Sequence, residues 1–293
     1  MQIAVIGGSG FLGSHLSDVL TQKGHNVKIF DRKKSKWIKK GQKMIIGNIL
    51  NSKLLDKTIK GSQIVYNFAA ISDIGYAKYK PIETAEINIV GTLNALKSSK
   101  KYKIKKFIQA SSIYATSEEG GFYARSKKAA EDYIEEFKKV FGLNYTILRF
   151  GSLYGERTDK SNAINNMIHN ALKRKKLIYP GMKNAARRYI HVRDAAKACA
   201  KVIDKKYNNK YITITGNKSV KIKKIFKILT TVFKIPKKKM FFLNKKYTGH
   251  YNVKPTIFKQ RTGKILSIRN QKEFKTSLLK LATDANTLKG KRI

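Results

Sequence analysis

Tyr123 and Lys127 lie four residues apart in the chain, and Ser112 precedes the tyrosine by eleven residues. Side chains four residues apart on a helix project from the same face. An ammonium beside a phenol favours the phenolate and lowers the tyrosine pKa from its reference value near ~10. We therefore predict that Tyr123 is the general base for an alcohol, that Lys127 lowers its pKa, and that Ser112 orients the substrate oxygen.

A tyrosine–lysine pair at this spacing is weak support alone, because the chain is rich in lysine. The N-terminal segment adds to it. Residues 2–6 form a short apolar run that is typical of a buried parallel strand, and Gly7, Gly10 and Gly13 lead from it into a helical pattern. Such glycines allow a sharp turn, a close approach to a pyrophosphate, and packing of helix on strand. Because a helix N-terminus also attracts phosphate, we predict a dinucleotide site.

The choice of dinucleotide depends on Asp31, which ends the strand pattern at 26–31 and lies eighteen residues after Gly13. A carboxylate there accepts hydrogen bonds from the adenosine ribose and repels a 2′-phosphate, so the sequence favours NAD. Arg32 and Lys33 follow directly and offer positive charge to a 2′-phosphate. NADP therefore remains the less favoured alternative.

With these motifs in this order, the chain resembles the extended short-chain dehydrogenase/reductase family, in particular the nucleotide-sugar epimerases and dehydratases. The resemblance covers nearly the whole chain and includes segments 47–49, 67–70, 88–92, 148–150 and 189–194. It implies Ser112, Tyr123 and Lys127 as the catalytic set. It also implies an NAD site made of Gly7, Gly10, Phe11, Leu12, Gly13, Asp31, Arg32, Asn48, Ile49, Phe68, Ala69, Ala70, Asn88, Tyr123, Lys127 and Phe150.

The same resemblance implies a nucleotide-diphosphate sugar as substrate, bound by Ser72, Ser111, Ser152 and Arg187. Arg187 matches the arginine that would clamp the diphosphate, a task that suits a guanidinium. Ser152 replaces an asparagine that touches the substrate in many members, so the sugar contacts must differ. Arg149 is expected to be a buried structural partner.

Departures from the family pattern narrow the reaction. The 4,6-dehydratases carry an Asp-Glu pair after the catalytic hydroxyl and glucuronate decarboxylases a glutamate nearby, whereas this chain has Ile113 and Tyr114. Cys199 lies in the wrong place for the cysteine of an epimerase/reductase. What remains is NAD-dependent C4 epimerisation of a UDP-hexose. The alternatives are an NAD(P)-dependent 4-keto-sugar reductase or dehydrogenase, or a non-catalytic NAD(P)-sensing or RNA-associated protein, although Tyr123 and Lys127 favour an enzyme.

Strand patterns alternate with helical ones along the chain, which predicts an α/β fold with a doubly wound, Rossmann-type parallel sheet of about seven strands. The strands are expected at 2–6, 26–31, 43–46, 64–69, 105–111, 144–149 and 210–215, and helices at 10–23, 84–100, 123–141 and 193–206. Residues 1–151 plus 210–215 would form the dinucleotide-binding domain. Residues 152–209 plus 216–293 would form a smaller substrate lobe.

The charge of the chain is unusual, because 63 Lys+Arg against 18 Asp+Glu give a net charge of +45. Such a balance attracts polyanions. The lysines are spread over the whole chain without a nucleic-acid module, so we expect no specific nucleic-acid partner and an advantage for anionic substrates. The basic, aromatic stretch 237–263 is left open between a lid over a base and a surface segment.

The cysteine content and the lack of a long apolar run indicate where in the cell the protein is expected. The single cysteine, Cys199, lies in an apolar helical pattern, which indicates a core position without a disulfide or metal role. No apolar run is long enough to cross a membrane, and the chain enters a strand directly at Met1, so a cytoplasmic protein is expected. The family resemblance implies a homodimer built on helices 84–100 and 123–141.

Overall fold

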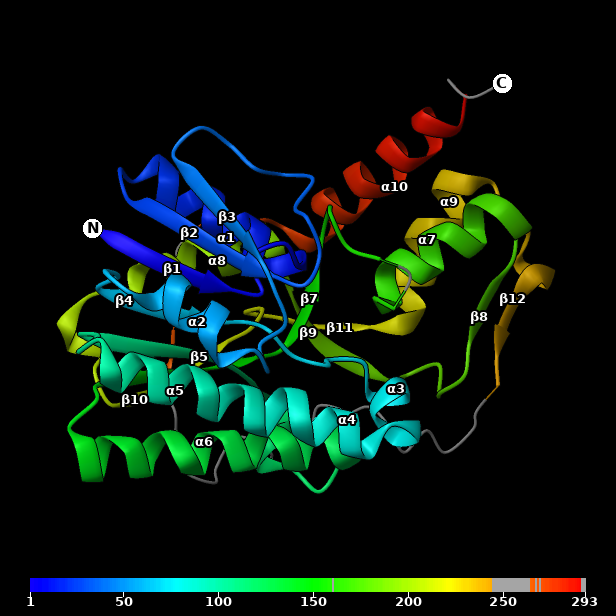
Figure 1. Ribbon diagram of the computed structural model, residues 1–293. Helices are drawn as coiled ribbons and strands as arrows, with labels where there is room; N and C mark the ends of the chain where they lie inside the picture. Colours follow the sequence, from blue (N-terminus) through cyan, green and yellow to red (C-terminus); the bar gives the residue numbers. More distant parts are fainter. Residues whose placement is uncertain (160, 244–263, 267, 269, 291–293) are drawn as a thin grey trace.

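The structure is a computed structural model that describes residues 1–159, 161–243, 264–266, 268 and 270–290 (Figure 1). Its centre is a sheet of eight parallel strands, which confirms the predicted fold class. In spatial order the strands are β13 (Lys264–Ile265), β10 (Lys210–Ile214), β6 (Tyr145–Phe150), β5 (Lys106–Ser112), β4 (Ile64–Asn67), β1 (Gln2–Ile6), β2 (Asn26–Asp31) and β3 (Gln42–Ile46).

The eighth strand was not expected from the sequence. It is β13, two exposed residues that pair with β10 at the sheet edge, too short to give a hydrophobic pattern. The other seven strands match the predicted ones to within about two residues at each end. The central strands form because their apolar runs are buried on both sides, as in β1, where Ile3 pairs with Val27 of β2 and Ile64 of β4. The edge strand β3 is only partly buried, and its Ile46 is exposed.

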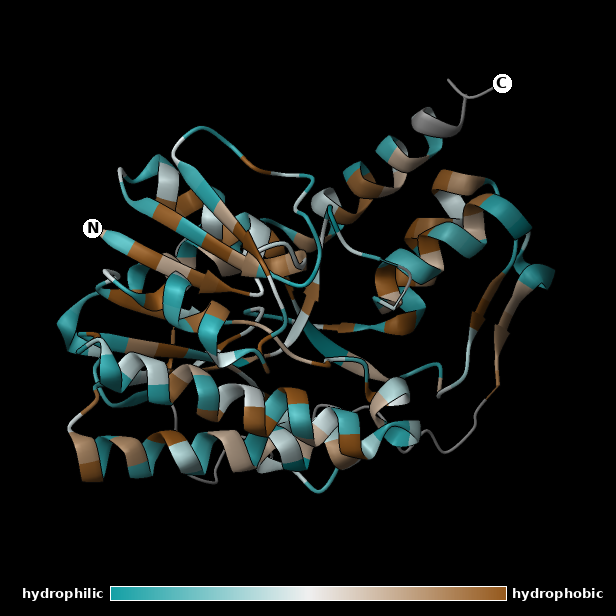
Figure 2. Cartoon of the chain, in the orientation of Figure 1, coloured by the Kyte–Doolittle hydropathy of each residue, from teal (hydrophilic) through white to brown (hydrophobic). Residues whose placement is uncertain are grey.

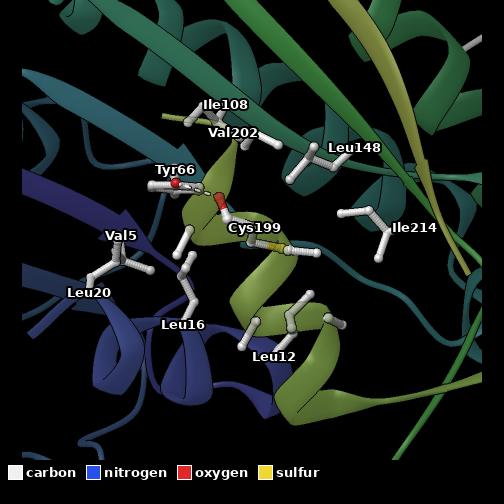
Figure 3. Close-up of a cluster of buried hydrophobic side chains, with 14 of the residues drawn as sticks. Val5, Leu12, Leu16, Leu20, Tyr66, Ile108, Leu148, Cys199, Val202 and Ile214 are labelled. Atoms are coloured by element: carbon white, nitrogen blue, oxygen red, sulfur yellow. Dashed lines mark hydrogen bonds between the residues drawn. The ribbon is translucent and has the colours of Figure 1, made fainter. Parts of the chain in front are cut away.

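Helices cover both faces of the sheet. On one face α1 (Phe11–Gln22) packs against α8 (Val192–Lys201), and Figure 3 shows Leu12, Leu16 and Leu20 in the same buried cluster as Cys199. The Tyr66 hydroxyl donates to the carbonyl oxygen of Cys199 at 2.8 Å. The predicted core position of Cys199 is therefore confirmed. The opposite face is covered by α2 (Ser52–Ile59), α5 (Gly91–Lys101) and α6 (Gly121–Phe141).

The predicted helix at 84–100 is interrupted. It consists of α4 (Pro81–Ala85), a π-helical turn over Glu86–Val90, and α5. A π turn adds one residue to the helical repeat and is frequent at functional sites. Here it lies where the helix passes the loop that follows β4. The pattern of apolar residues alone does not reveal such a turn.

A smaller lobe lies beside the carboxyl ends of the strands (Figure 1). It contains α7 (Ala163–Arg174), α9 (Ile222–Phe233) and α10 (Phe274–Gly290), which share one apolar core. Two small sheets complete it, β11 (Ser219–Lys221), β9 (Ala186–His191) and β7 (Ser152–Tyr154) in one, and β12 (Met240–Phe242) with β8 (Leu177–Tyr179) in the other. Short helices are α3 (Ile74–Tyr79) and the 3₁₀ turns Ile113–Thr116, Lys205–Tyr207 and Lys237–Lys239.

The boundaries predicted for the two lobes, 1–151 plus 210–215 and 152–209 plus 216–293, stay a prediction. One helix that the prediction assigns to the smaller lobe, α8, packs on the large sheet against α1. This helix ends at Lys201 rather than 206, where the Lys106 ammonium donates to the carbonyl oxygens of Val202, Ile203 and Asp204. Part of the stretch 237–263, residues 244–263, lies outside the described residues.

The described helices are amphipathic, and Figure 2 shows hydrophobic and hydrophilic residues alternating along them. In the part of the chain that the structure describes, no helix is both long and apolar enough to cross a membrane. Within the same part, no group of three or more His, Cys, Asp or Glu side chains is placed to hold a metal ion.

Candidate active site

One cavity of about 820 Å³ opens at the carboxyl ends of the parallel strands. Gly7 after β1, Asp31 at the end of β2, Phe68 after β4, Ser112 at the end of β5 and Phe150 at the end of β6 all line it. This is the edge where open parallel sheets bind ligands. The residues of the smaller lobe that line it include Ser152, Arg157 and Arg187.

The glycine turn has the geometry that its spacing predicts. Gly7 has a left-handed φ of +81°, and a Cβ there would lie 2.4 Å from the backbone nitrogen of Ala69. A Cβ at Gly13 would lie 2.1 Å from the carbonyl oxygen of Gly7. Gly10 lines the cavity, and its Cβ would meet only the Gly7 carbonyl, at 3.2 Å.

The turn is therefore suited to a pyrophosphate. Its first and third glycines are required by packing within the protein, whereas the second leaves space on the cavity side. Helix α1 begins directly after Gly10, and no side chain caps its N-terminus. Its first N–H groups are the donors that would hold the phosphates of NAD.

Asp31 is fixed at the edge of the same turn. One carboxylate oxygen accepts from the Ser9 backbone N–H at 3.0 Å and the other from the Lys33 N–H at 3.1 Å. The Ser9 hydroxyl also donates to the carbonyl oxygen of Lys33 at 2.8 Å. Ser9 was not predicted as a site residue; it links the glycine turn to Asp31 and Lys33 at the end of β2. Asp31, Arg32 and Lys33 all line the cavity.

This arrangement makes Asp31→Asn a test of cofactor choice. The substitution removes the charge that repels a 2′-phosphate, while Arg32 and Lys33 remain on the cavity wall. We expect affinity for NAD to fall about tenfold and affinity for NADP to rise, since hydrogen bonds to charged groups contribute about 1.5–3 kcal/mol. Calorimetric titration with both dinucleotides measures this. Asp31→Glu, which keeps the charge, is the control, and an unchanged ratio in Asp31→Asn would contradict the role of Asp31.

Most of the other predicted cofactor residues also line the cavity, namely Phe11, Leu12, Asn48, Ile49, Phe68, Ala69, Ala70 and Phe150. The Asn48 side-chain oxygen already accepts from the Leu50 N–H at 3.0 Å, so an adenine amine would share that oxygen. The Ile49 side chain packs directly against the backbone of Gly91. A Cβ at Gly91 would lie only 2.6 Å from it, so glycine is needed there. The Phe68 ring meets Tyr66 and Phe150 edge to face.

Asn88 is the exception among the predicted cofactor residues, because it does not line the cavity. It is buried in the π-helical turn, where its side chain accepts from the Ile71 N–H at 2.8 Å and donates to the Ile71 carbonyl at 3.0 Å. It also donates to the Ser126 hydroxyl at 2.9 Å. Asn88 therefore holds the loop that follows β4 against helix α6, one layer behind the cavity wall.

The three predicted catalytic side chains converge on this cavity. Ser112 ends β5, Tyr123 lies in the first turn of α6, and Lys127 follows one turn later, as the sequence spacing predicts. The Ser112 and Tyr123 hydroxyls are hydrogen-bonded. The Lys127 ammonium donates to the carbonyl oxygen of Ala110 at 3.0 Å and lies 5.9 Å from the centroid of the Tyr123 ring.

The pKa values differ from the expectation that Lys127 lowers that of Tyr123, and this expectation is corrected. Burial raises the pKa of Tyr123 to about 12, and only the hydrogen bond from Ser112 opposes it. Burial also lowers the pKa of Lys127 to about 8, against the attraction of Glu131. Desolvation exceeds the charge effect because both side chains are almost fully enclosed.

A buried ion pair joins helix α6 to strand β6 behind the cavity wall. Arg149 donates through Nε and Nη2 to the two oxygens of Glu131, at 2.9 and 2.6 Å, and both side chains are buried. The Ser111 hydroxyl donates to Glu131 at 2.6 Å. The prediction of Arg149 as a buried structural partner is confirmed. Glu131 was missed, although its position four residues after Lys127 places it on the same face of α6.

Ser111 thus lines the cavity but has a structural partner. We expect Ser111→Ala to lower the free energy of unfolding by about 1–2 kcal/mol, because a hydrogen bond to a charged, buried carboxylate is lost while Arg149 still pairs with it. Denaturant unfolding checks this, with turnover of the sugar measured in parallel. A stable variant with much weaker substrate binding would instead favour the substrate contact predicted for Ser111.

The other predicted substrate residues all line the cavity, with Ser72 after β4, Ser152 in β7 and Arg187 in β9. Arg187 is buried and donates to the Tyr179 hydroxyl at 3.2 Å, so it presents its charge from the smaller lobe. Ile113 and Tyr114 follow Ser112 in a 3₁₀ turn on the cavity wall, where a dehydratase would need carboxyl groups.

A doubly wound sheet with a glycine turn, an acid at the end of the second strand and a serine, tyrosine and lysine around one cavity is typical of the extended short-chain dehydrogenases/reductases. The family model described as "NAD dependent epimerase/dehydratase family" matches residues 3–214. The chain therefore belongs to this family, which confirms the predicted family, an NAD-dependent enzyme and NAD as cofactor.

Similar proteins agree with this membership. The chain is 30% identical over 253 residues to a putative UDP-glucose 4-epimerase of Methanocaldococcus jannaschii, covering 78% of this chain and 81% of the relative. It is 29% identical to a UDP-N-acetyl-alpha-D-glucosaminuronate decarboxylase of Bacillus cytotoxicus, over 75% and 77% of the two chains. The crystal structure of UDP-glucose 4-epimerase from Thermotoga maritima, solved with UDP-glucose, has a TM-score of 0.84 at 23% identity, covers 98% and 100% of the two chains, and shows the shared fold.

Proposed function

We propose that this protein catalyses the C4 epimerisation of a UDP-hexose. The observation that carries the proposal is the convergence of Ser112, Tyr123 and Lys127 on the cavity that the glycine turn also lines. The similarity to a putative UDP-glucose 4-epimerase over most of both chains supports the same reaction. A UDP-hexose brings two negative phosphates, and in this proposal Arg187, which lines the cavity from the smaller lobe, binds them.

In this proposal Tyr123 moves the proton of the sugar 4-hydroxyl. Its oxygen accepts that proton as the alcohol is oxidised to the ketone and returns it when the ketone is reduced on the opposite face. Bound NAD supplies the chemistry of accepting a hydride from C4 and giving it back. Ser112 donates to the substrate oxygen and stabilises its developing charge. The Lys127 ammonium lies 5.9 Å from the centroid of the Tyr123 ring and donates to the carbonyl oxygen of Ala110, so its charge lies at the wall of the same cavity.

The neighbouring reactions of the family are less well supported. The relatives include a decarboxylase and a dTDP-D-glucose 4,6-dehydratase. The two positions after Ser112 carry Ile113 and Tyr114, whose side chains cannot act as the carboxyl acid and base of a dehydration. An epimerase needs only reversible oxidation at one carbon. A 4-keto-sugar reductase would use the same three residues. The assay below distinguishes it from an epimerase by the net change in nicotinamide oxidation state.

The test is to incubate the purified protein and NAD with UDP-glucose, UDP-N-acetylglucosamine or UDP-glucuronate and to follow the sugars by NMR. Epimerisation predicts that one of these is converted to an equilibrium mixture with its C4 epimer without net accumulation of reduced nicotinamide. Stoichiometric reduced nicotinamide with a 4-keto product would identify a dehydrogenase. Absence of conversion with every UDP-sugar would sink the proposal.

We further propose that the protein is a homodimer formed by α4, α5 and α6. The support is that large apolar side chains of these helices are exposed, among them Ile82 at 75%, Val140 at 59% and Phe141 at 47%. Such side chains, left exposed on neighbouring helices, are what a second copy of the helices would cover. Sedimentation equilibrium measures the mass in solution, and a monomer at micromolar concentration would contradict the dimer.

We also propose that the enzyme works in the cytoplasm on precursors of surface polysaccharides. Nucleotide sugars and NAD are substrates and cofactors of that compartment, and the family implies this use. We propose that the net charge of +45 attracts such anionic substrates rather than a specific nucleic acid. A KM that does not rise with salt concentration would contradict electrostatic attraction, and fractionation of cells tests the location.

A further inference from the structure

Arg157 lies in the turn between β7 and α7 and lines the ligand cavity. Its backbone is left-handed, with a φ of +66°, which costs free energy for a residue with a side chain. Its side chain is only 15% exposed. A largely enclosed arginine in a strained backbone position at a cavity wall needs an explanation, and none of the predicted site residues supplies one.

One side of the guanidinium is firmly anchored to the dinucleotide-binding half of the protein. Its Nη2 donates to Asp18 of α1 at 2.8 Å, and the group lies 4.6 Å from the ring centroid of Trp37. Asp18 also pairs with Lys39 at 2.9 Å. Burial opposes ionisation of Asp18, but the hydrogen bonds from Lys39 and Arg157 keep its pKa below the usual value.

The other side of the guanidinium is not satisfied by the protein. Among the described residues, the buried Nη1 of Arg157 has no hydrogen-bond partner. Leaving a charged, buried donor unbonded is costly, and native proteins rarely do so without a functional reason. The pattern differs from that of Arg149, whose Nε and Nη2 both donate to Glu131. An anion in the cavity would satisfy Nη1.

The surroundings indicate which kind of anion. The turn is held to α1 because His15 Nε2 lies 3.2 Å from the carbonyl oxygen of Glu156, and the His15 ring meets Phe11, which lines the cavity beside the glycine turn. On its other side the turn leads into the start of α7, where Asn162 and Ala163 line the cavity. Arg157 thus lies between the element that would hold the cofactor phosphates and the lobe that would hold the substrate.

We propose that Arg157 binds a diphosphate oxygen in this cavity through Nη1, while Asp18 and Trp37 hold its guanidinium in place. A guanidinium can serve a carboxylate with one edge and a phosphate with another, which an ammonium cannot do. The ligand is a nucleoside diphosphate group, present both in NAD and in a nucleotide sugar. The inference rests on the proposed function, because it requires that NAD and a nucleotide sugar enter this cavity. Binding measurements with ADP-ribose and with UDP show which of these ligands Arg157 contacts.

The experiment compares the wild-type protein with Arg157→Gln by titration with ADP-ribose and, separately, with UDP. Trp37 is the single tryptophan of the chain and lies against Arg157, so its fluorescence reports binding at this place. We expect the fluorescence change to disappear and the affinity for one of the two ligands to fall at least tenfold. Loss with ADP-ribose assigns Arg157 to the cofactor, and loss with UDP assigns it to the sugar nucleotide.

Arg193→Gln is the matched control, because Arg193 pairs with Glu156 in the same turn but does not line the cavity. It should bind both ligands as the wild type does. Arg157→Lys covers the case in which Arg157→Gln fails to fold, and it should also lose affinity. If a folded Arg157 variant binds ADP-ribose and UDP as tightly as the wild type, the proposal is wrong. If the wild type binds ADP-ribose but not UDP, the UDP-sugar assignment fails, while the ADP-ribose titration still tests Arg157.

Discussion

Replacement of Tyr123 by phenylalanine is expected to lower kcat for the sugar interconversion by about 10²–10⁴-fold, the range typical of a lost general base. The substitution removes one oxygen and keeps the ring, which lies 6.5 Å from the ring of Tyr114 and fills the same space. Binding of NAD and substrate should change little, because neither the glycine turn nor Arg187 is touched. The initial rate of epimerisation, with thermal shifts on adding NAD, measures both effects.

A second readout of Tyr123 is the stability at high pH. Burial raises its pKa from 10.0 to about 12 in the folded protein, so the folded state retains this proton longer than the unfolded chain does. The stabilisation is present in full below pH 10 and is lost as the pH rises through 12. The wild type should therefore lose about 2–3 kcal/mol relative to Tyr123→Phe over that interval. Equilibrium unfolding of both proteins at several pH values tests this.

Two outcomes would remove the catalytic assignment. One is a Tyr123→Phe variant with full activity on every sugar that the wild type converts. The other is an inactive variant that has also lost its affinity for NAD, because that result would mean a damaged site rather than a missing base. Ser112→Ala is a useful comparison, since it keeps the phenol and removes its hydrogen-bond partner, together with the acceptor of the Tyr114 N–H.

The features that the sequence predicted best are those fixed by local patterns. The strands of the large sheet follow from short apolar runs, and the glycine turn follows from backbone geometry that only glycine tolerates at Gly7 and Gly13. Tyr123 and Lys127 could be placed together because a spacing of four residues on one helix defines a shared face. Each of these predictions depends on residues close together in the chain.

The features that the sequence did not predict depend on contacts between distant segments. Asn88 was expected at the cofactor, but the π-helical turn directs it to Ile71 and Ser126. The orientation of the Arg157 guanidinium depends on its hydrogen bond to Asp18, a residue 139 positions away in the chain. The pKa of Tyr123 was predicted with the wrong sign, because the spacing to Lys127 is visible in the sequence while the enclosure of both groups is not.

That enclosure gives the second large prediction, which concerns Lys127→Met. We expect activity to fall about 10²-fold or more, since the ammonium beside the phenol is lost. We also expect the free energy of unfolding at pH 7 to rise by about 1–3 kcal/mol. Burial lowers the lysine pKa from 10.5 to about 8, which corresponds to about 3 kcal/mol against the charged form in the folded state. Methionine fills a similar volume without that charge.

The substitution should leave few buried groups without partners. The carbonyl oxygen of Ala110, which accepts from Lys127, also accepts from the Gln109 side chain at 3.1 Å. Glu131 keeps its pair with Arg149. Lys128→Met is the matched control, because Lys128 is the next residue and its partly exposed side chain pairs with Asp132. Its stability should stay within about 0.5 kcal/mol of the wild type, with activity retained.

The pH dependence separates desolvation from lost packing. Between pH 8 and 10.5 the unfolded chain binds the lysine proton more tightly than the folded protein does, so the wild type gains stability as the pH rises through this range. The advantage of Lys127→Met should therefore shrink toward pH 10.5. A variant less stable than the wild type at pH 7 would show that pairing of Lys127 outweighs its burial. A more stable but inactive variant would mean that this lysine is retained for chemistry at the expense of the fold.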